Sequence, residues 1–196
     1  MANRKLPEKL IKETAKRVFF TEGKLHATTQ DIADAAGITR TSLHYYFRTR
    51  ELLMKEVFMD AIEELGGRMD AILKSGKPFR QKIEAAIDLF LTNSVMYPYQ
   101  ETFLVTEMLS DNADLYDYKR KGRGDMVSFL NEIEREMKAG AIKKMPPVQF
   151  LLNLFSLTSY PVVMRPLHQL MFSLSKREYD KLISDRKKII MDLLFR

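Results

Sequence analysis

The sequence predicts an all-α protein, and two observations support this fold class. Apolar residues recur at the 3.6-residue period of an α-helix in every long segment, whereas no window of convincing length shows the strand period of 2. Glycine and proline residues separate these segments, and such residues commonly end or interrupt helices. We therefore expect a helical protein, which at 196 residues is long enough to bury a substantial core.

The first helix is expected over residues 7–22. Pro7 suits the opening position of a helix, and Gly23 follows the expected end. Ile11, Ala15 and Phe19 belong to one apolar stripe along this segment. The lysines at positions 9, 12 and 16 are expected on the solvent side.

Two short helices joined by a tight turn are expected over residues 28–47. Thr28 or Thr29 can cap the first helix, because a threonine hydroxyl accepts a hydrogen bond from an unpaired N–H of the first turn. Gly37 falls where the chain must reverse, a position that commonly needs a positive φ. Thr39 can cap the second helix, whose buried edge is then formed by Leu43 and Phe47. This pattern predicts a helix-turn-helix.

The other face of the second short helix is polar and contains no carboxylate. Such a helix suits the major groove of DNA. Its residues are Arg40, Thr41, Ser42, His44 and Tyr45.

The same stretch resembles the recognition helix and following segment of the TetR family of bacterial transcriptional regulators. The resemblance covers roughly the first quarter of the chain. His44 and Arg48 depart from it, since the family more often shows Tyr and Pro there. The residues that carry it are the run from Gly37 to Leu53, together with Phe19, Gly23, Thr29, Ile32 and Ala33.

Arg40 is expected to be the principal base-reading residue, because the arginine fork matches the edge of guanine. Thr41, Ser42 and His44 are expected to make further contacts with bases or backbone. A second set is expected to hold phosphates and fix the register on DNA. Its members are Lys24, Thr29, Thr39, Tyr45, Tyr46 and Arg50.

Positive charge is concentrated at the N-terminal end. Residues 1–50 carry ten of the 32 Lys and Arg residues but only five of the 26 Asp and Glu residues. The rest of the chain is nearly balanced, with 22 basic and 21 acidic residues. This asymmetry is expected of a phosphate-binding module joined to a nearly neutral domain. We expect a DNA-binding domain over residues 1–49 and a helical ligand-binding and dimerisation domain over residues 50–196.

The second domain is expected to consist of further helices. Thr49 can cap the first of them, and Gly66 and Gly67 interrupt its middle. The two glycines indicate either a close helix contact or simple tolerance, or else a flexible point between the domains. Basic residues 119–123 are expected to form a solvated loop or helix end. The expected helices cover residues 50–73, 78–96, 101–110, 112–140 with a weak point at Gly122 and Gly124, 147 onward with a kink or break at Pro161 and Pro166, and 176–194.

The sequence offers no catalytic, cofactor or metal motif. His26, His44 and His168 are far apart and lack ligand spacing, and cysteine is absent. No apolar run approaches the roughly 18 to 20 residues that span a bilayer, and no signal peptide is evident. We therefore expect a cytoplasmic protein that is not an enzyme and has no membrane partner.

The resemblance implies a pocket for a small-molecule effector among the fourth to eighth helices. The second domain is rich in Met and aromatic residues, which suit a cavity for an apolar ligand but also an ordinary core. Thr106 and Glu107 are the candidate polar anchors. The full set of candidates is Met96, Tyr99, Phe103, Thr106, Glu107, Tyr116, Met126, Phe129, Phe155 and Tyr160.

The resemblance also implies a homodimer built by the last two long helices. Their excess of apolar residues agrees with an interface, although a monomer core would produce the same excess. The candidate interface residues are Phe150, Leu151, Leu154, Leu182, Ile189, Ile190 and Leu193.

These observations together favour a ligand-responsive DNA-binding regulator. The expected form is a homodimeric repressor that leaves a near-palindromic operator in double-stranded DNA when an apolar or amphipathic molecule binds. An activator, or a regulator that responds to a protein partner, is the nearest competitor. A small-molecule carrier or sensor with a vestigial DNA-binding segment is the alternative from another class.

Overall fold

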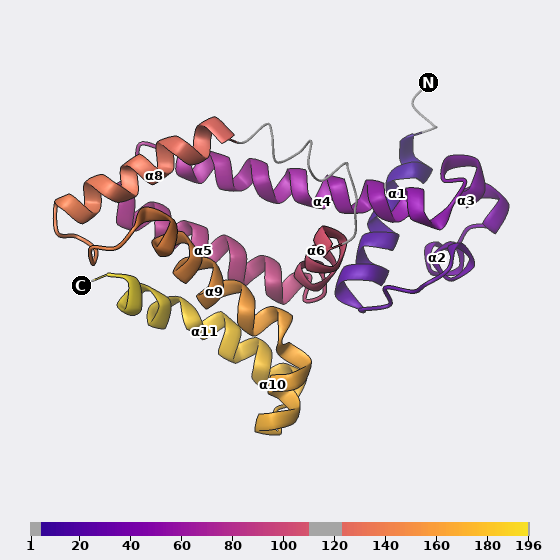
Figure 1. Ribbon diagram of the computed structural model, residues 1–196. Helices are drawn as coiled ribbons and strands as arrows, with labels where there is room; N and C mark the ends of the chain where they lie inside the picture. Colours follow the sequence, from indigo (N-terminus) through magenta and orange to yellow (C-terminus); the bar gives the residue numbers. More distant parts are fainter. Residues whose placement is uncertain (1–4, 110–122, 196) are drawn as a thin grey trace. The chain divides into compact units, whose positions relative to one another are not determined.

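The computed structural model describes residues 5–109 and 123–195, and this part of the chain is helical (Figure 1). Its extended pairing is limited to one isolated bridge between Ile142 and Phe195. The all-α prediction is confirmed. The α-helices are α1 (Lys5–Lys16), α2 (Thr29–Ala36), α3 (Arg40–Tyr46), α4 (Arg50–Leu73), α5 (Phe79–Met96), α6 (Gln100–Leu109), α8 (Arg123–Lys138), α9 (Pro147–Val163), α10 (Arg165–Phe172) and α11 (Lys176–Leu194).

The first helix differs from the prediction, because α1 is followed by a π-helical turn, η1 (Arg17–Thr21). Within this turn the N–H of Glu22 donates to the carbonyl of Arg17, five residues earlier, at 3.0 Å. The consecutive residues Val18, Phe19 and Phe20 are all buried. A wider turn brings three consecutive side chains closer to one side than an α-helix does, which accounts for the change of helix type.

The chain forms two compact units. The first, which we call the head, comprises Met1–Arg68 together with Tyr97–Gln100. The second unit comprises Met69–Met96 and Glu101–Arg196. The functional boundary expected between residues 49 and 50 stays a prediction. The fully buried side chains of the head include Ile11, Phe19, Phe20, Ile32, Leu43, Phe47 and Leu53.

Helix α4 has the predicted bounds, and the hydroxyl of Thr49 caps it by accepting from the N–H of Leu52 at 3.1 Å. Gly66 and Gly67 lie inside this uninterrupted helix. A Cβ added at Gly67 would meet no described atom within 4 Å, so no close contact requires glycine at that position. The boundary between the two compact units falls directly after these glycines, at Arg68.

The core of the second unit is built by α5, α8, α9 and α11, with Phe79 near its centre. The ring of Phe79 lies about 6 Å from those of Phe129, Phe150 and Phe195. The described part of the expected seventh helix is α8, while its expected start near Asn112 lies outside the described residues. Packing of these helices against one another supplies the main stabilisation of an all-α domain.

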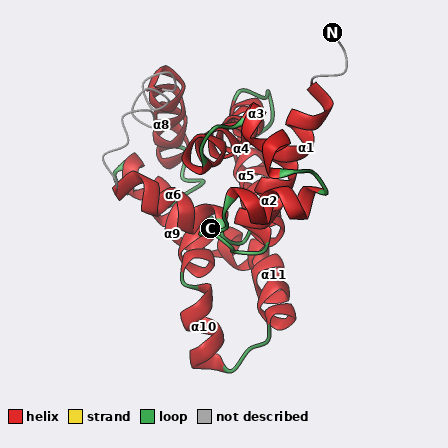
Figure 2. Cartoon of the chain, turned by 90° about the vertical axis from the view of Figure 1, so that its right-hand side faces the viewer, coloured by secondary structure: helices red, strands yellow, loops and turns green. Residues whose placement is uncertain are grey.

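The break expected near Pro161 and Pro166 occurs at Met164, between α9 and α10. Helix α9 continues through Pro161, and the carbonyl of Pro161 accepts a hydrogen bond from the hydroxyl of Tyr179 at 2.7 Å. Helix α10 then packs against α9 and α11 (Figure 2). No helix within the described ranges is long and apolar enough to cross a membrane.

Candidate nucleic-acid interface

The helix-turn-helix is formed by α2, a glycine turn and α3. Thr28 caps α2 in a reciprocal arrangement, because its hydroxyl accepts from the N–H of Asp31 while the Asp31 carboxylate accepts from the N–H of Thr28. Hydrogen bonds from the N–H and the hydroxyl of Thr28 to this carboxylate lower the pKa of Asp31. Gly37 has a φ of 66°, and the N–H of Ile38 donates to the carbonyl of Ala33 at 3.0 Å. Local sequence therefore determines where both ends of α2 fall.

Helix α3 presents its polar face to solvent. Thr39 caps the helix by accepting from the N–H of Ser42 at 3.1 Å. Leu43 is fully buried and Phe47 is 2% exposed, so these two residues pack α3 against the rest of the head. The side chains of Arg40, Thr41, Ser42, His44 and Tyr45 are exposed. No described carboxylate pairs with Arg40, which leaves its guanidinium available to a base edge.

The residues expected to hold phosphates lie in different environments. Arg50 is directed inward, where its Nε donates to the carbonyl of Ala27 at 2.8 Å and its Nη2 donates to that of Leu25. Its guanidinium also lies 5.9 Å from the centre of the Phe19 ring. The structure thus gives Arg50 a bracing role between α4 and the loop before α2, which sequence reasoning did not anticipate. Lys24 is exposed and pairs with Glu22 at 2.9 Å.

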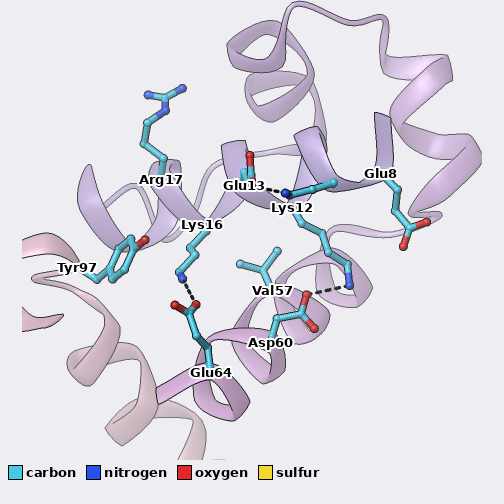
Figure 3. Close-up of a pocket in the computed structure, with 10 residues that line it drawn as sticks. Glu8, Lys12, Glu13, Lys16, Arg17, Val57, Asp60, Glu64 and Tyr97 are labelled. Atoms are coloured by element: carbon cyan, nitrogen blue, oxygen red, sulfur yellow. Dashed lines mark hydrogen bonds and ion pairs between the residues drawn. The ribbon is translucent and has the colours of Figure 1, made fainter. Parts of the chain in front are cut away.

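A groove of about 760 Å³ lies between α1 and the middle of α4, within the head (Figure 3). Lys12 lies 2.9 Å from Glu56 and 3.0 Å from Asp60, and Lys16 lies 2.9 Å from Glu64. Partial burial would lower the pKa of Lys12, but hydrogen bonds to the two carboxylates outweigh it and raise the pKa. The prediction that these two lysines face solvent was therefore wrong, because both form ion pairs that connect α1 with α4.

The helix-turn-helix lies inside a segment that matches a known family. Residues 11–57 match the model of "Bacterial regulatory proteins, tetR family". The uncharacterized HTH-type transcriptional regulator YhgD of Bacillus subtilis is 26% identical over 148 residues, which are 71% of this chain and 74% of that protein. The HTH-type transcriptional repressor KstR2 of Rhodococcus jostii is 39% identical over 69 residues, which are 35% of this chain and 34% of that protein.

Solved structures share the fold over the whole chain. The ketosteroid transcriptional regulator KstR2 of Mycobacterium tuberculosis has a TM-score of 0.69 at 16% identity, covering 100% of this chain and 97% of that one. FadR from Bacillus subtilis, solved in complex with stearoyl-CoA, has a TM-score of 0.65 at 16% identity, covering 96% and 97%. The chain belongs to the TetR family. It is a helix-turn-helix transcriptional regulator that binds DNA, and not an enzyme.

The structure of this TetR-family regulator does not gather the candidate ligand residues in one place. Tyr99 belongs to the head, and Phe129 is packed in the core of the second unit. Met96 lines a cavity of about 380 Å³ between α5 and α11. Phe103 is buried, whereas Thr106, Met126, Phe155 and Tyr160 are exposed. Tyr116 and the side chain of Glu107 lie outside the described residues.

The candidate dimer residues divide into two groups. Phe150, Leu151, Leu154 and Ile190 are at most 7% exposed and fill the core of the second unit. Burial within one chain leaves them almost no surface for a partner. The prediction that these four residues form a dimer interface is therefore corrected: they belong to the core. Leu182, Ile189 and Leu193 are 51%, 54% and 65% exposed on α11. The period of 3.6 identifies an apolar stripe but cannot say whether it faces inward or outward.

Sequence reasoning missed two features of the second unit. Glu101, at the start of α6, has a buried carboxyl oxygen without a hydrogen-bond partner. A glutamate in the first turn of a helix is common for electrostatic reasons, so its position alone did not single it out. Arg165 is 4% exposed and pairs with Asp180 at 2.5 Å. Within the described residues, no group of His, Cys, Asp and Glu has the arrangement of a metal site.

Proposed function

We propose that the protein is a homodimeric repressor that leaves its operator when a small apolar or amphipathic molecule binds the second unit. The observation that carries this proposal is the exposed face of α3, which offers Arg40 and several hydroxyls without a neighbouring acidic residue on that helix. A helix of this kind, attached to the head by Leu43 and Phe47, suits base reading in the major groove.

Arg40 reads bases in this proposal, because its fork can donate two hydrogen bonds to guanine. Thr41, Ser42 and His44 contribute further contacts from the same exposed face. The remaining contacts go to phosphates, which position the head without reading sequence. Their donors are Lys24, Thr29, Thr39, Tyr45 and Tyr46, whereas Arg50, also expected from sequence to hold a phosphate, instead braces the loop before α2.

The dimer is supported by exposed apolar stripes on two neighbouring helices. Helices α9 and α11 pack side by side in the second unit. Leu152 and Phe155 are exposed on α9, and Leu182, Ile189 and Leu193 are exposed on α11. Exposed apolar residues gathered on one helix in this way commonly mark an interface. Twofold symmetry would place two α3 helices in successive major grooves, about 34–36 Å apart.

The effector class is supported by the relatives. KstR2 is described as a ketosteroid transcriptional regulator, and FadR was solved with stearoyl-CoA. Steroids and acyl chains share a large apolar surface, which suits the Met-rich and aromatic composition of the second unit. In the proposed response, effector binding changes the spacing of the two heads through α4. Gly66 and Gly67 are the flexible point at which α4 bends.

The decisive experiment compares wild-type protein with Arg40→Ala on a duplex obtained by selection with the wild type. Each lost bidentate contact is expected to cost about 1–3 kcal/mol of specific binding. Binding is measured by fluorescence anisotropy, and the dimer is monitored by sedimentation. Arg177→Ala, an exposed arginine on α11, is the matched control and is expected to bind as the wild type does.

Unchanged specific binding by Arg40→Ala would remove Arg40 from the interface. Failure of the wild type to enrich any sequence would favour the alternative, a carrier with a vestigial head. Equal loss with Arg177→Ala would indicate a general charge effect rather than base reading.

A further inference from the structure

The corner between α5 and α6 belongs to the head, although the helices on either side of it belong to the second unit. Residues Tyr97–Gln100 are grouped with Met1–Arg68, whereas α5 ends at Met96 and Glu101 begins the next part of the second unit. The chain therefore passes from the second unit into the head and back within four residues. This gives the head a second covalent link to the second unit, in addition to α4.

Tyr97 and Tyr99 hold the corner against η1 and its flanks. The N–H of Tyr99 donates to the carbonyl of Phe20 at 3.1 Å. The ring of Tyr99 covers Gly23 so closely that a Cβ at this position would lie 2.6 Å from two ring atoms. Gly23 also has a φ of 72°, which disfavours other residues. The ring of Tyr97 lies 4.4 Å from Nζ of Lys16.

The π-helical turn explains why Tyr99 can make its backbone hydrogen bond. In a regular α-helix the carbonyl of Phe20 would accept from the N–H of Lys24. Here the N–H of Lys24 donates instead to the carbonyl of Val18 at 3.1 Å. The carbonyl of Phe20 consequently accepts from a residue that lies almost 80 positions later in the chain. π-Turns are frequent at functional sites.

Glu101 follows the corner directly and occupies an unfavourable environment in the second unit. Its Oε1 lies 3.3 Å from the hydroxyl of Ser94, whose proton is also shared with the carbonyl of Phe90 at 2.8 Å. Its Oε2 is buried and has no hydrogen-bond partner. Burial raises the pKa of Glu101, and the neighbouring hydroxyls of Ser159 and Ser94 oppose this effect without cancelling it. A buried polar atom without a partner destabilises the folded protein. A rearrangement of α5, α6 or α9 that gives Oε2 a partner would therefore be favoured and would displace Glu101.

We propose that the α5–α6 corner is a second route by which the second unit controls the head. A conformational change in the second unit displaces Glu101, and Tyr99 transmits this displacement to the head. The inference rests on the proposed function, because it assumes that operator affinity is what the second unit regulates. Glu101 acts as a positioning residue and contacts no DNA. Its displacement shifts Tyr99, two residues earlier, and the close fit over Gly23 passes that shift to η1.

A double-mutant cycle tests this route without an effector. Operator affinity is measured for wild type, Glu101→Gln, Tyr99→Ala and the double variant, on the selected duplex. Energetic coupling between sites typically corresponds to about 5- to 150-fold in affinity. We expect Glu101→Gln to change affinity at least about fivefold alone, and less than about twofold in the Tyr99→Ala background. Glu134→Gln, an exposed carboxyl on α8, is the matched control.

An equal effect of Glu101→Gln in both backgrounds, or no effect in either, overturns the proposal. Tyr99→Leu replaces Tyr99→Ala if the latter does not fold. Hydrogen exchange of residues 17–24 in Glu101→Gln provides a readout that needs no DNA, and unchanged exchange there also overturns the proposal. Absence of specific DNA binding by the wild type would instead contradict the proposed function, while the exchange measurement still tests the coupling.

Discussion

Individual residues of this protein show how burial decides between a structural and a functional role. Arg40 and Arg50 lie ten positions apart, yet the Arg40 side chain is exposed on α3 while Arg50 is bound to carbonyls of its own head. Glu101 is the opposite of a solvated surface glutamate, since one of its oxygens is buried without a partner. The chemistry of a side chain thus indicates what it can bind, and its surroundings determine whether it is free to do so.

Ionisation of Glu101 is expected to make folded-state stability depend on pH. Its pKa is raised in the folded protein, chiefly by burial, so the folded state retains a proton that the unfolded state has lost. The contribution of Glu101 to the free energy of unfolding is therefore at its most favourable below the unfolded pKa, about 4.3. It decreases as pH rises from there through the folded pKa. Urea unfolding at a series of pH values should show this decrease in wild type but not in Glu101→Gln. Parallel pH profiles for the two proteins would contradict the account.

The ends of several helices in this chain are determined by local signals that can be read from sequence. The helix type and the buried face also depend on contacts between distant residues, which cannot be read from sequence. Helices α4 and α11 have the predicted bounds, with Thr49 and Ser175 capping them. The turn at Gly37 was equally predictable, because a positive φ follows from local chain reversal. The π-turn η1 was not predictable, since its stabilisation includes the hydrogen bond from distant Tyr99. Helical periodicity likewise could not distinguish Ile190 in the core from exposed Ile189.

Removal of the cap of α2 is expected to destabilise the helix-turn-helix measurably. Thr28→Ala deletes the hydroxyl that accepts from the N–H of Asp31. Loss of such a cap typically costs about 1 kcal/mol, within a range of about 0.5–2 kcal/mol. The free energy of unfolding is measured by urea titration with circular dichroism. Thr92→Ala, an exposed threonine within α5, should change it by less than about 0.5 kcal/mol. Equal effects of the two substitutions would argue against the capping role.

The whole molecule joins a head, whose excess positive charge lies within residues 1–50, to a second helical unit, and the two are linked by α4 and by both sides of the α5–α6 corner. Sequence alone was sufficient for the all-α class and the family, because both depend on local patterns. It was insufficient for the ligand and dimer surfaces, which depend on how helices far apart in sequence pack. Tyr99 illustrates this limit, because it was expected in a ligand pocket and lies against Gly23 in the head.

Dimeric operator binding can be tested directly by a protection footprint of the purified protein on DNA upstream of its own gene, repeated across a salt series. A twofold dimer is expected to protect two half-sites, about 34–36 Å apart and related by a near-palindrome. Affinity should fall about a thousandfold or more between about 50 and 200 mM salt, because several phosphate contacts release counterions.

Ile189→Lys, which puts a charge in the exposed stripe of α11, should lose the paired protection at the same concentration. A single half-site protected equally by wild type and Ile189→Lys would contradict the dimer, and sequence-indifferent binding would contradict the regulator itself.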